Sequence, residues 1–141
     1  ILPSDANFTL RISYGHVAGY EGDDAVEYGP FTTLDGIIEK NRTGNPDFTV
    51  PQHLIDLYEQ KAFTDYADPS DGKLHTAFVA TNHTTGGNSG SPVLNAKGEL
   101  IGLNFDRAWN GVMSDIIFNP LQCRNITLDI RYLLFIGRFS L

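Results

Sequence analysis

Residues 85–92 form the stretch of the sequence that is best suited to chemistry. They hold three glycines and two serines, between a run rich in Val and Thr and a Val-Leu pair. Glycine loses backbone entropy in a strand and adds no packing, so this cluster indicates a loop with unusual backbone angles. A serine between glycines in such a loop can hold its hydroxyl beside backbone N–H groups. We therefore interpret Ser89 as a nucleophile and Gly87 as part of its oxyanion hole.

The segment after the loop predicts which residues return beside Ser89. Residues 91–94 and 99–105 have the pattern of two strands joined by a tight turn. A turn centred on 96–97 pairs residues whose numbers add up to about 193, allowing for bulges. In this register Ser89 faces the region of Asn104.

Two charged residues follow at the end of the second strand. In the same register Gly87 faces the region of Asp106, and Arg107 comes next. An arginine can grip a carboxylate with two parallel hydrogen bonds, and the carboxylate of Asp106 can bind an ammonium group. Together these residues fit a substrate that has a free amine and an acidic side chain.

A non-catalytic interpretation is equally compatible with the spacing. Gly-Asn-Ser-Gly also occurs as an ordinary turn, and Asp106 and Arg107 would then form an exposed ion pair that contributes under about 1 kcal/mol. Spacing alone supports a nucleophile and a turn residue equally well at Ser89. The motif is not the nucleophile elbow of the α/β-hydrolases, because position 91 is Ser rather than Gly.

A serine nucleophile needs a general base, which is normally a histidine held by a carboxylate. No spacing singles out one of the four histidines for this role; they are His16, His53, His75 and His83. The single cysteine, Cys123, is interpreted as a packing residue, and it excludes an intrachain disulfide. No His/Cys/Asp spacing predicts a metal site, and the loop lacks the Lys-Ser/Thr of a phosphate-binding loop. We therefore expect no metal and no cofactor.

The composition is that of one globular, soluble domain of 141 residues, with an apolar fraction of 41%. Ten basic and 17 acidic residues give a formal net charge of −7, which argues against a nucleic-acid partner because phosphate binding needs a basic patch. No apolar run is long enough to span a membrane. The sequence starts with Ile1 rather than methionine, so we expect it to begin partway through a longer protein.

The elements expected around the loop are short strands and three helices. Alternating or Val/Thr-rich runs predict strands over 7–14, 16–20, 25–31, 74–81, 91–94, 99–105 and 112–118. Helical spacing predicts helices over 34–40, 52–61 and 128–136. Thr127 would cap the last helix, with Asp129 in its first turn. Six or so short strands with a terminal helix suggest a small closed β-barrel.

Several runs of the sequence resemble a known family of bacterial peptidases. The runs TGGNSGSPVLN over 85–95 and GELIGLNFD over 98–106 are similar to the C-terminal part of the dipeptidyl peptidases 7 and 11. The runs NITLDIRYLL over 125–134 and NFTLR over 7–11 resemble the same enzymes. The resemblance covers nearly the whole chain, and its central motif is long and specific.

The resemblance implies a fold and an activity. Members of the family are serine exopeptidases of the chymotrypsin-like clan, with two β-barrels and an inserted helical domain. They remove dipeptides from the N-termini of peptides, in the periplasm or at the surface of Gram-negative bacteria. Residues 1–141 would then be a single domain, the C-terminal half of the catalytic domain, built as a six-stranded barrel. Residues 1–70 would supply strands and two short helices, and residues 71–141 the nucleophile-bearing part and the terminal helix.

The family's functional residues match four positions of this sequence. Ser89 matches the nucleophile, and the backbone N–H groups of Gly87 and Ser89 match the oxyanion hole. Asp106 matches the acidic residue that helps to hold the substrate's N-terminal ammonium group. The next residue separates the subfamilies: glycine goes with hydrophobic residues at P1, the residue before the cleaved bond, and arginine goes with Asp or Glu. Arg107 therefore implies the dipeptidyl-peptidase 11 type.

One departure from the family concerns the catalytic His and Asp, which lie in its N-terminal barrel. Nothing in these 141 residues matches that segment. We therefore expect the chain to be inactive alone and, in the full-length protein, to pack against the N-terminal barrel. In isolation we expect it to form homodimers or higher contacts, unrelated to native function, through the apolar face that this barrel would cover. The open alternatives are a dipeptidyl peptidase for hydrophobic P1 residues, a chymotrypsin-like endopeptidase, and a non-catalytic β-barrel that binds other molecules.

Overall fold

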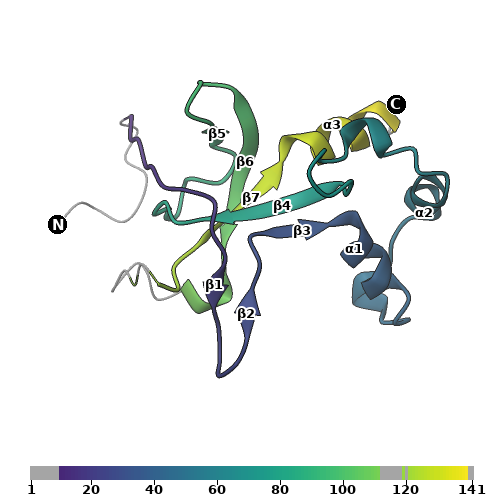
Figure 1. Cartoon of the computed structure of the whole chain (residues 1–141), viewed down its shortest axis with the longest axis horizontal. Coiled ribbons are helices and arrows are strands. Elements are labelled where there is room, and N and C mark those ends of the chain that lie inside the picture. The colour runs from purple at the N-terminus through teal and green to yellow at the C-terminus, as the bar shows by residue number, and fades with distance from the viewer. Residues whose placement is uncertain (1–9, 112–118, 120, 140–141) are drawn as a thin grey trace.

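The chain folds around an antiparallel sheet of five strands, ordered β3-β4-β7-β6-β5 (Figure 1). A computed structural model describes residues 10–111, 119 and 121–139. The predicted mainly β architecture is confirmed. The strands of the large sheet are β3 (Phe31–Thr33), β4 (His75–Ala80), β5 (Pro92–Leu94), β6 (Leu100–Arg107) and β7 (Asn125–Asp129). A separate hairpin pairs β1 (Tyr20–Glu21) with β2 (Glu27–Tyr28).

Three α-helices gather at one end of this sheet (Figure 1). They are α1 (Leu34–Asn41), α2 (Gln52–Glu59) and α3 (Ile130–Phe139), with short 3-10 helices η1 (Pro46–Phe48) and η2 (Thr64–Tyr66). The helices α1 and α2 confirm two of the predicted helices. Four buried apolar side chains form the core at this end: Leu34, Leu57, Leu74 and Phe135. Within the described part of the chain, no helix is both long and apolar enough to cross a membrane.

The N-terminal segment differs from its prediction as a strand. Residues 10–14 have no regular secondary structure, while residues 7–9 lie outside the described residues. The side chains of Leu10, Ile12 and Tyr14 are almost fully exposed. Within the described residues, this segment joins no sheet, so its alternating apolar side chains stay exposed. Further along, the predicted strand over 16–20 is reduced to a bridge from Val17 to Ala80 and the start of β1.

The C-terminal helix begins later than the sequence predicts. Thr127, the predicted cap, lies in the middle of β7 and is completely buried. This strand pairs with β4 on one side and β6 on the other, and these two ladders outweigh the helical spacing of the sequence. The helix starts at Ile130, and Asp129 Oδ1 accepts the backbone N–H of Arg131 at 2.9 Å in the manner of an N-cap.

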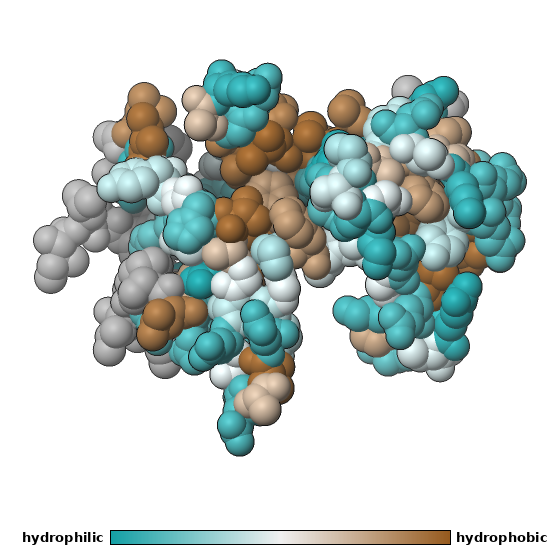
Figure 2. Space-filling view, viewed as in Figure 1, coloured by the Kyte–Doolittle hydropathy of each residue, from teal (hydrophilic) through white to brown (hydrophobic). Residues whose placement is uncertain are grey.

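The sheet is open within the described residues, since β3 and β5 at its ends pair there with β4 and β6 respectively. Apolar side chains gather around β5 and β6 on the face shown in Figure 2. Three exposed large ones belong to this hairpin: Leu94, Leu100 and Phe105. Residues 112–118, where a further strand is predicted, lie outside the described residues. The closed six-stranded barrel therefore stays a prediction.

Candidate active site

The glycine loop consists of two consecutive tight turns. The N–H of Asn88 donates to the carbonyl of Thr85 at 3.1 Å, and the N–H of Ser91 donates to the carbonyl of Asn88 at 3.0 Å. The third residue of each turn is a glycine with positive φ, at +89° in Gly87 and +81° in Gly90. A turn of type II needs this backbone conformation, which a side chain disfavours. The glycines therefore shape the backbone on both sides of Ser89.

Asn104 of β6 fastens this loop to the sheet. Its side-chain Nδ2 donates to the carbonyl of Asn88 at 3.1 Å. Its carbonyl accepts the N–H of Gly90 at 2.7 Å, and its own N–H donates to the carbonyl of Ser91 at 2.9 Å. These three bonds confirm the prediction that the region of Asn104 returns beside the loop that carries Ser89.

A second layer of buried polar groups supports Asn104 from β7. The Nδ2 of Asn125 donates to Asn104 Oδ1 at 3.0 Å and to Thr127 Oγ1 at 3.1 Å. All three side chains are at least nine-tenths buried. The sequence analysis did not single out Asn125, and it interpreted Thr127 as a helix cap. The available signal was a polar residue at every second position of an otherwise apolar run, which is typical of a strand with a polar buried face.

The hairpin register is displaced from the predicted one by two residues. Pro92 pairs with Leu103 rather than with Ile101. The turn is one residue longer than predicted, because Asn95 donates its N–H to the carbonyl of Glu99. A bulge in the pairing between Val93 and Leu94 adds the second residue.

Asp106 and Arg107 are the last two residues of β6, and they follow a second shift in the strand pairing. The pairing with β7 shifts between Asn104 and Asp106, which is the pattern of a β-bulge and re-aims the residues that follow. Asp106 is exposed, and Arg107 is half-buried. The Oδ1 of Asp106 accepts the N–H of Arg107 at 2.7 Å, which fixes the carboxylate close to the backbone. Both charged residues therefore lie on β6, the strand to which the glycine loop is also hydrogen-bonded.

Ser89 itself is exposed. Three of the four histidine rings bond elsewhere: His16 to the hydroxyl of Thr81, His53 to the carbonyl of Phe139, and His75 to Asp71. The fourth, His83, accepts a hydrogen bond from the hydroxyl of Ser13 at its carbonyl oxygen. No group of His, Cys, Asp and Glu within the described residues could hold a metal ion.

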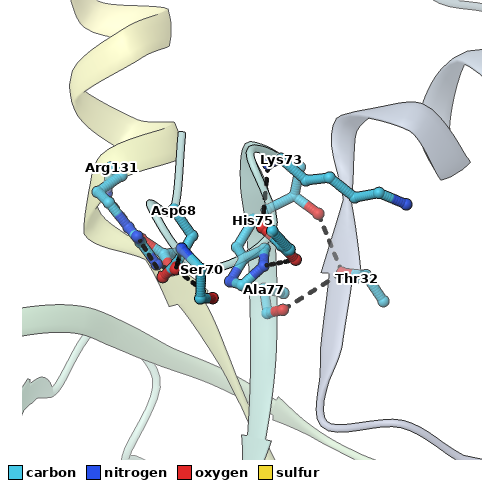
Figure 3. A network of polar contacts seen from close by, with 10 residues as sticks. Thr32, Asp68, Ser70, Lys73, His75, Ala77 and Arg131 are labelled. Carbon is cyan, nitrogen blue, oxygen red and sulfur yellow. Dashed lines mark hydrogen bonds and ion pairs between the residues drawn. The ribbon is translucent and has the colours of Figure 1, made fainter. Parts of the chain in front are cut away.

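A second polar cluster lies at the opposite end of β7 (Figure 3). Arg131 donates to Asp68 at 2.7 Å and to Asp129 at 3.0 Å, and the hydroxyl of Ser70 donates to Asp68 at 2.6 Å. The hydrogen bond from Ser70, followed by that from Arg131, holds the pKa of Asp68 well below its usual range. This cluster ties α3 to the loop before β4.

His75 and Asp71 form an imidazole–carboxylate pair beside that cluster (Figure 3). The His75 Nε2 lies 2.8 Å from Asp71 Oδ2, and this contact lowers the pKa of Asp71. The pair has the chemistry of two members of a catalytic triad. However, His75 begins β4, whereas the network under the glycine loop meets that strand at its other end, where Ala80 pairs with Asn125. We therefore assign the pair a structural role.

Two hollows adjoin the loop and the end of β6. The larger is an open, apolar hollow of about 310 Å³ next to the loop, lined by Gly90, Leu103, Asn104, Phe105 and Leu128. The smaller is a cavity of about 10 Å³ that Arg107 helps to line. The site therefore combines an exposed hydroxyl on a rigid loop, a carboxylate, a guanidinium and an apolar wall.

Comparison with known proteins assigns the chain to a family. Residues 1–138 match the model of the family described as peptidase S46. The chain is 57% identical over 132 residues to the Asp/Glu-specific dipeptidyl-peptidase of Flavobacterium psychrophilum, which covers 94% of this chain and 18% of that protein. It is 48% identical to dipeptidyl-peptidase 7 of Porphyromonas gingivalis, with 95% and 18% covered.

Solved structures give the same result. The crystal structure of Porphyromonas endodontalis DPP11 in complex with the dipeptide Arg-Asp matches with a TM-score of 0.89 and 53% identity. The match covers 96% of this chain and 19% of that one. The chain thus spans less than a fifth of the length of its relatives. The resemblance to the dipeptidyl peptidases 7 and 11 is confirmed, and the chain belongs to the peptidase S46 family.

Proposed function

We propose that this chain is the nucleophile-bearing part of a serine peptidase that releases N-terminal dipeptides and prefers Asp or Glu at P1. One observation carries the proposal: Asn104 fastens the glycine loop to β6, so that Ser89 and Arg107 belong to one rigid unit. The similarity to Asp/Glu-specific dipeptidyl-peptidases extends over this unit. An arginine so held can bind the P1 carboxylate through two hydrogen bonds.

The proposed reaction begins when a histidine outside this chain takes the proton of the Ser89 hydroxyl. The Ser89 oxygen attacks the carbonyl carbon of the second substrate residue, and the N–H groups of Gly87 and Ser89 bind the oxyanion. The peptide C–N bond then breaks, and the histidine gives its proton to the leaving amine, which is the N-terminus of the shortened peptide. Asp106 binds the N-terminal ammonium group, which limits the released product to a dipeptide. Water then hydrolyses the ester at Ser89 and frees the dipeptide. The reaction needs no cofactor.

The remainder of the protein belongs to the same proposal, because the chain covers only 18% of its relatives. The catalytic His and Asp come from an N-terminal barrel, which packs against this chain to give a chymotrypsin-like double barrel. Within it, the open sheet described above closes into six strands. The chain alone is inactive, and it forms homodimers through the apolar face that the N-terminal barrel would cover. It acts on peptides in the periplasm or at the cell surface of a Gram-negative bacterium.

The nucleophile is tested in the full-length protein with a fluorogenic dipeptidyl-Asp substrate. Replacing Ser89 with Ala lowers kcat by about 1,000-fold or more, since the hydroxyl that attacks the substrate is lost. Ser91→Ala is the matched control, because Ser91 lies in the same loop and bonds through its backbone. This control retains activity within about threefold. Equal loss in both variants would show that the loop, and not the Ser89 hydroxyl, matters.

Two other enzymatic functions are weaker candidates. A peptidase for hydrophobic P1 residues leaves the Arg107 guanidinium without a substrate group, although dipeptidyl-peptidase 7 is 48% identical. An endopeptidase leaves the Asp106 carboxylate without an ammonium group to bind.

A non-catalytic binding barrel is the alternative from a different class of protein. Treating the full-length protein with a fluorophosphonate separates the classes, because only an activated serine is labelled. Mass spectrometry would place the adduct on Ser89 in an enzyme, and an unmodified Ser89 would favour the binding barrel.

A further inference from the structure

The small cavity beside Arg107 has the properties of a site for one buried water. Its volume of about 10 Å³ is the space open to the centre of a water molecule. A single water needs roughly this volume and two to four polar partners. Six of the seven residues that line the cavity have polar side chains; the seven are Asn82, His83, Thr84, Arg107, Cys123, Arg124 and Asn125.

Two of the residues that line the cavity have a buried oxygen without a hydrogen-bond partner in the described part of the chain. Thr84 Oγ1 and Asn125 Oδ1 are buried and have no partner among the described residues. Both residues are at least nine-tenths buried, with exposed fractions of 9% and 1%. The Nδ2 of Asn125 is already engaged by Asn104 and Thr127, so only its oxygen remains. A buried polar atom without a partner destabilises the fold. One water between the two oxygens would remove both penalties.

Size and polarity decide between a water and a substrate carboxylate as the occupant. A carboxylate has three heavy atoms and does not fit a cavity with room for one. Moreover, the Asn125 oxygen is an acceptor and would repel a carboxylate, whereas a water can donate to it. The carboxylate that pairs with Arg107 therefore lies outside this cavity, although Arg107 also lines it.

We propose that Thr84 and Asn125 hold a water that forms part of the acid-recognising site. The Thr84 hydroxyl donates to the water, the water donates one hydrogen to Asn125 Oδ1, and its second hydrogen is directed to the P1 carboxylate on Arg107. Thr84 is then a positioning residue that acts through the water. The water converts the acceptor Asn125 into a donor toward the substrate. This inference rests on the proposed function for its substrate and on the two unpartnered oxygens for the site itself.

The test has a structural arm that does not depend on activity. A high-resolution crystal structure of the full-length protein should show a water within about 3.2 Å of both Thr84 Oγ1 and Asn125 Oδ1. Thr84→Val keeps the shape of the side chain and removes the donor, so its structure should show weaker or no density at that position. A dry cavity in the wild-type protein would overturn the proposal.

The kinetic arm compares dipeptidyl-Asp with dipeptidyl-Met substrates. Thr84→Val should raise KM for the acidic substrate about tenfold with little change in kcat, since the lost bond acts equally in the ground and transition states. The Met substrate should be unaffected, and Thr84→Ser should restore the wild-type KM. An equal change for both substrates would show a merely structural role and overturn the proposal. If the wild-type protein does not cleave the acidic substrate, the proposed function fails, while the crystal structure still decides whether the water is there.

Discussion

At the scale of single residues, hydrogen bonds hold the glycine loop on the sheet. They involve the backbone of Asn88 and the side chains of Asn104 and Asn125. A chain of hydrogen bonds runs from Asn88 through Asn104 to Asn125, from the surface to the middle of the sheet. Buried polar networks of this kind fix one geometry, because any other arrangement leaves polar groups without partners. The loop therefore holds Ser89 and the two neighbouring N–H groups in place before a substrate arrives, as an oxyanion hole requires.

Replacing Asn104 with Ala tests this network. The change leaves the Asn125 amide with one partner fewer and leaves the carbonyl of Asn88 with the N–H of Ser91 alone, so we expect a loss of about 1–3 kcal/mol in local stability. Amide hydrogen exchange of the full-length protein should show faster exchange at Gly90 and Ser91. Asn45→Ala, at the exposed cap of η1, is the control and should leave exchange in the loop unchanged. Unchanged exchange in both variants would contradict the account.

Sequence reasoning could identify the residues of the loop but not what supports them. The sequence alone shows the glycines around Ser89 and the charges of Asp106 and Arg107, because such residues are unusual beside strands. The sequence does not show what Asn125 and Thr84 contact, since the type of a residue does not say whether its side chain is buried. Only the tertiary structure shows that Asn125 bonds to Asn104 on the neighbouring strand and that Thr84 Oγ1 is buried without a partner among the described residues.

At the scale of elements, β7 determines how the chain is arranged. It lies in the middle of the sheet, carries the support of the glycine loop at its start and leads into α3 at its end. The sequence predicted part of it as helix, because Leu128 and the residues after it also have helical spacing. Strand partners far away in the sequence outweigh such local preferences. The hairpin was recognised more easily, since its turn and its strands are adjacent in the chain.

Gly102→Ala tests the packing between β6 and β7. A Cβ at this position would collide with the carbonyl oxygen of Leu128 and lie 2.5 Å from the methyl group of Thr127. We expect the full-length protein to lose about 1–3 kcal/mol and to melt at a lower temperature. Gly137→Ala is the matched control in α3, where an added Cβ meets nothing within 4 Å. This control should be neutral or stabilising by about 0.5–1 kcal/mol. Equal melting temperatures for wild type and Gly102→Ala would argue against the close pairing.

The cluster around Asp68 should make stability depend on acid pH. Its folded-state pKa lies below that of the unfolded chain, so its carboxylate stabilises the fold above the unfolded value of about 3.9. That contribution is lost as the pH falls below about 4 toward the folded-state pKa. Asp68→Asn should lower the melting temperature at pH 7 and flatten its decline between about pH 4 and 2. Asp65→Asn is the control, because Asp65 is mostly exposed and lies 3.9 Å from Arg138. A decline that is equally steep in Asp68→Asn and wild type would contradict this assignment.

At the scale of the whole molecule, the chain exposes surfaces that a complete protein would cover. Leu94, Leu100 and Phe105 face outward from the hairpin, and the segment with Ile12 and Tyr14 has no sheet to join within the described residues. The chain covers 19% of the solved DPP11 structure, which leaves most of that protein to supply the missing contacts. In the proposed function, the general base for Ser89 comes from a part of the protein outside this chain.

The most direct test of the proposed function is a change of specificity in the full-length protein. We predict that wild-type protein cleaves a dipeptidyl-Asp substrate far better than a dipeptidyl-Met substrate. Arg107→Gly removes the group that pairs with the P1 carboxylate, so kcat/KM for the Asp substrate should fall about 100-fold, while that for the Met substrate should rise. An Asp preference that survives Arg107→Gly would contradict the account.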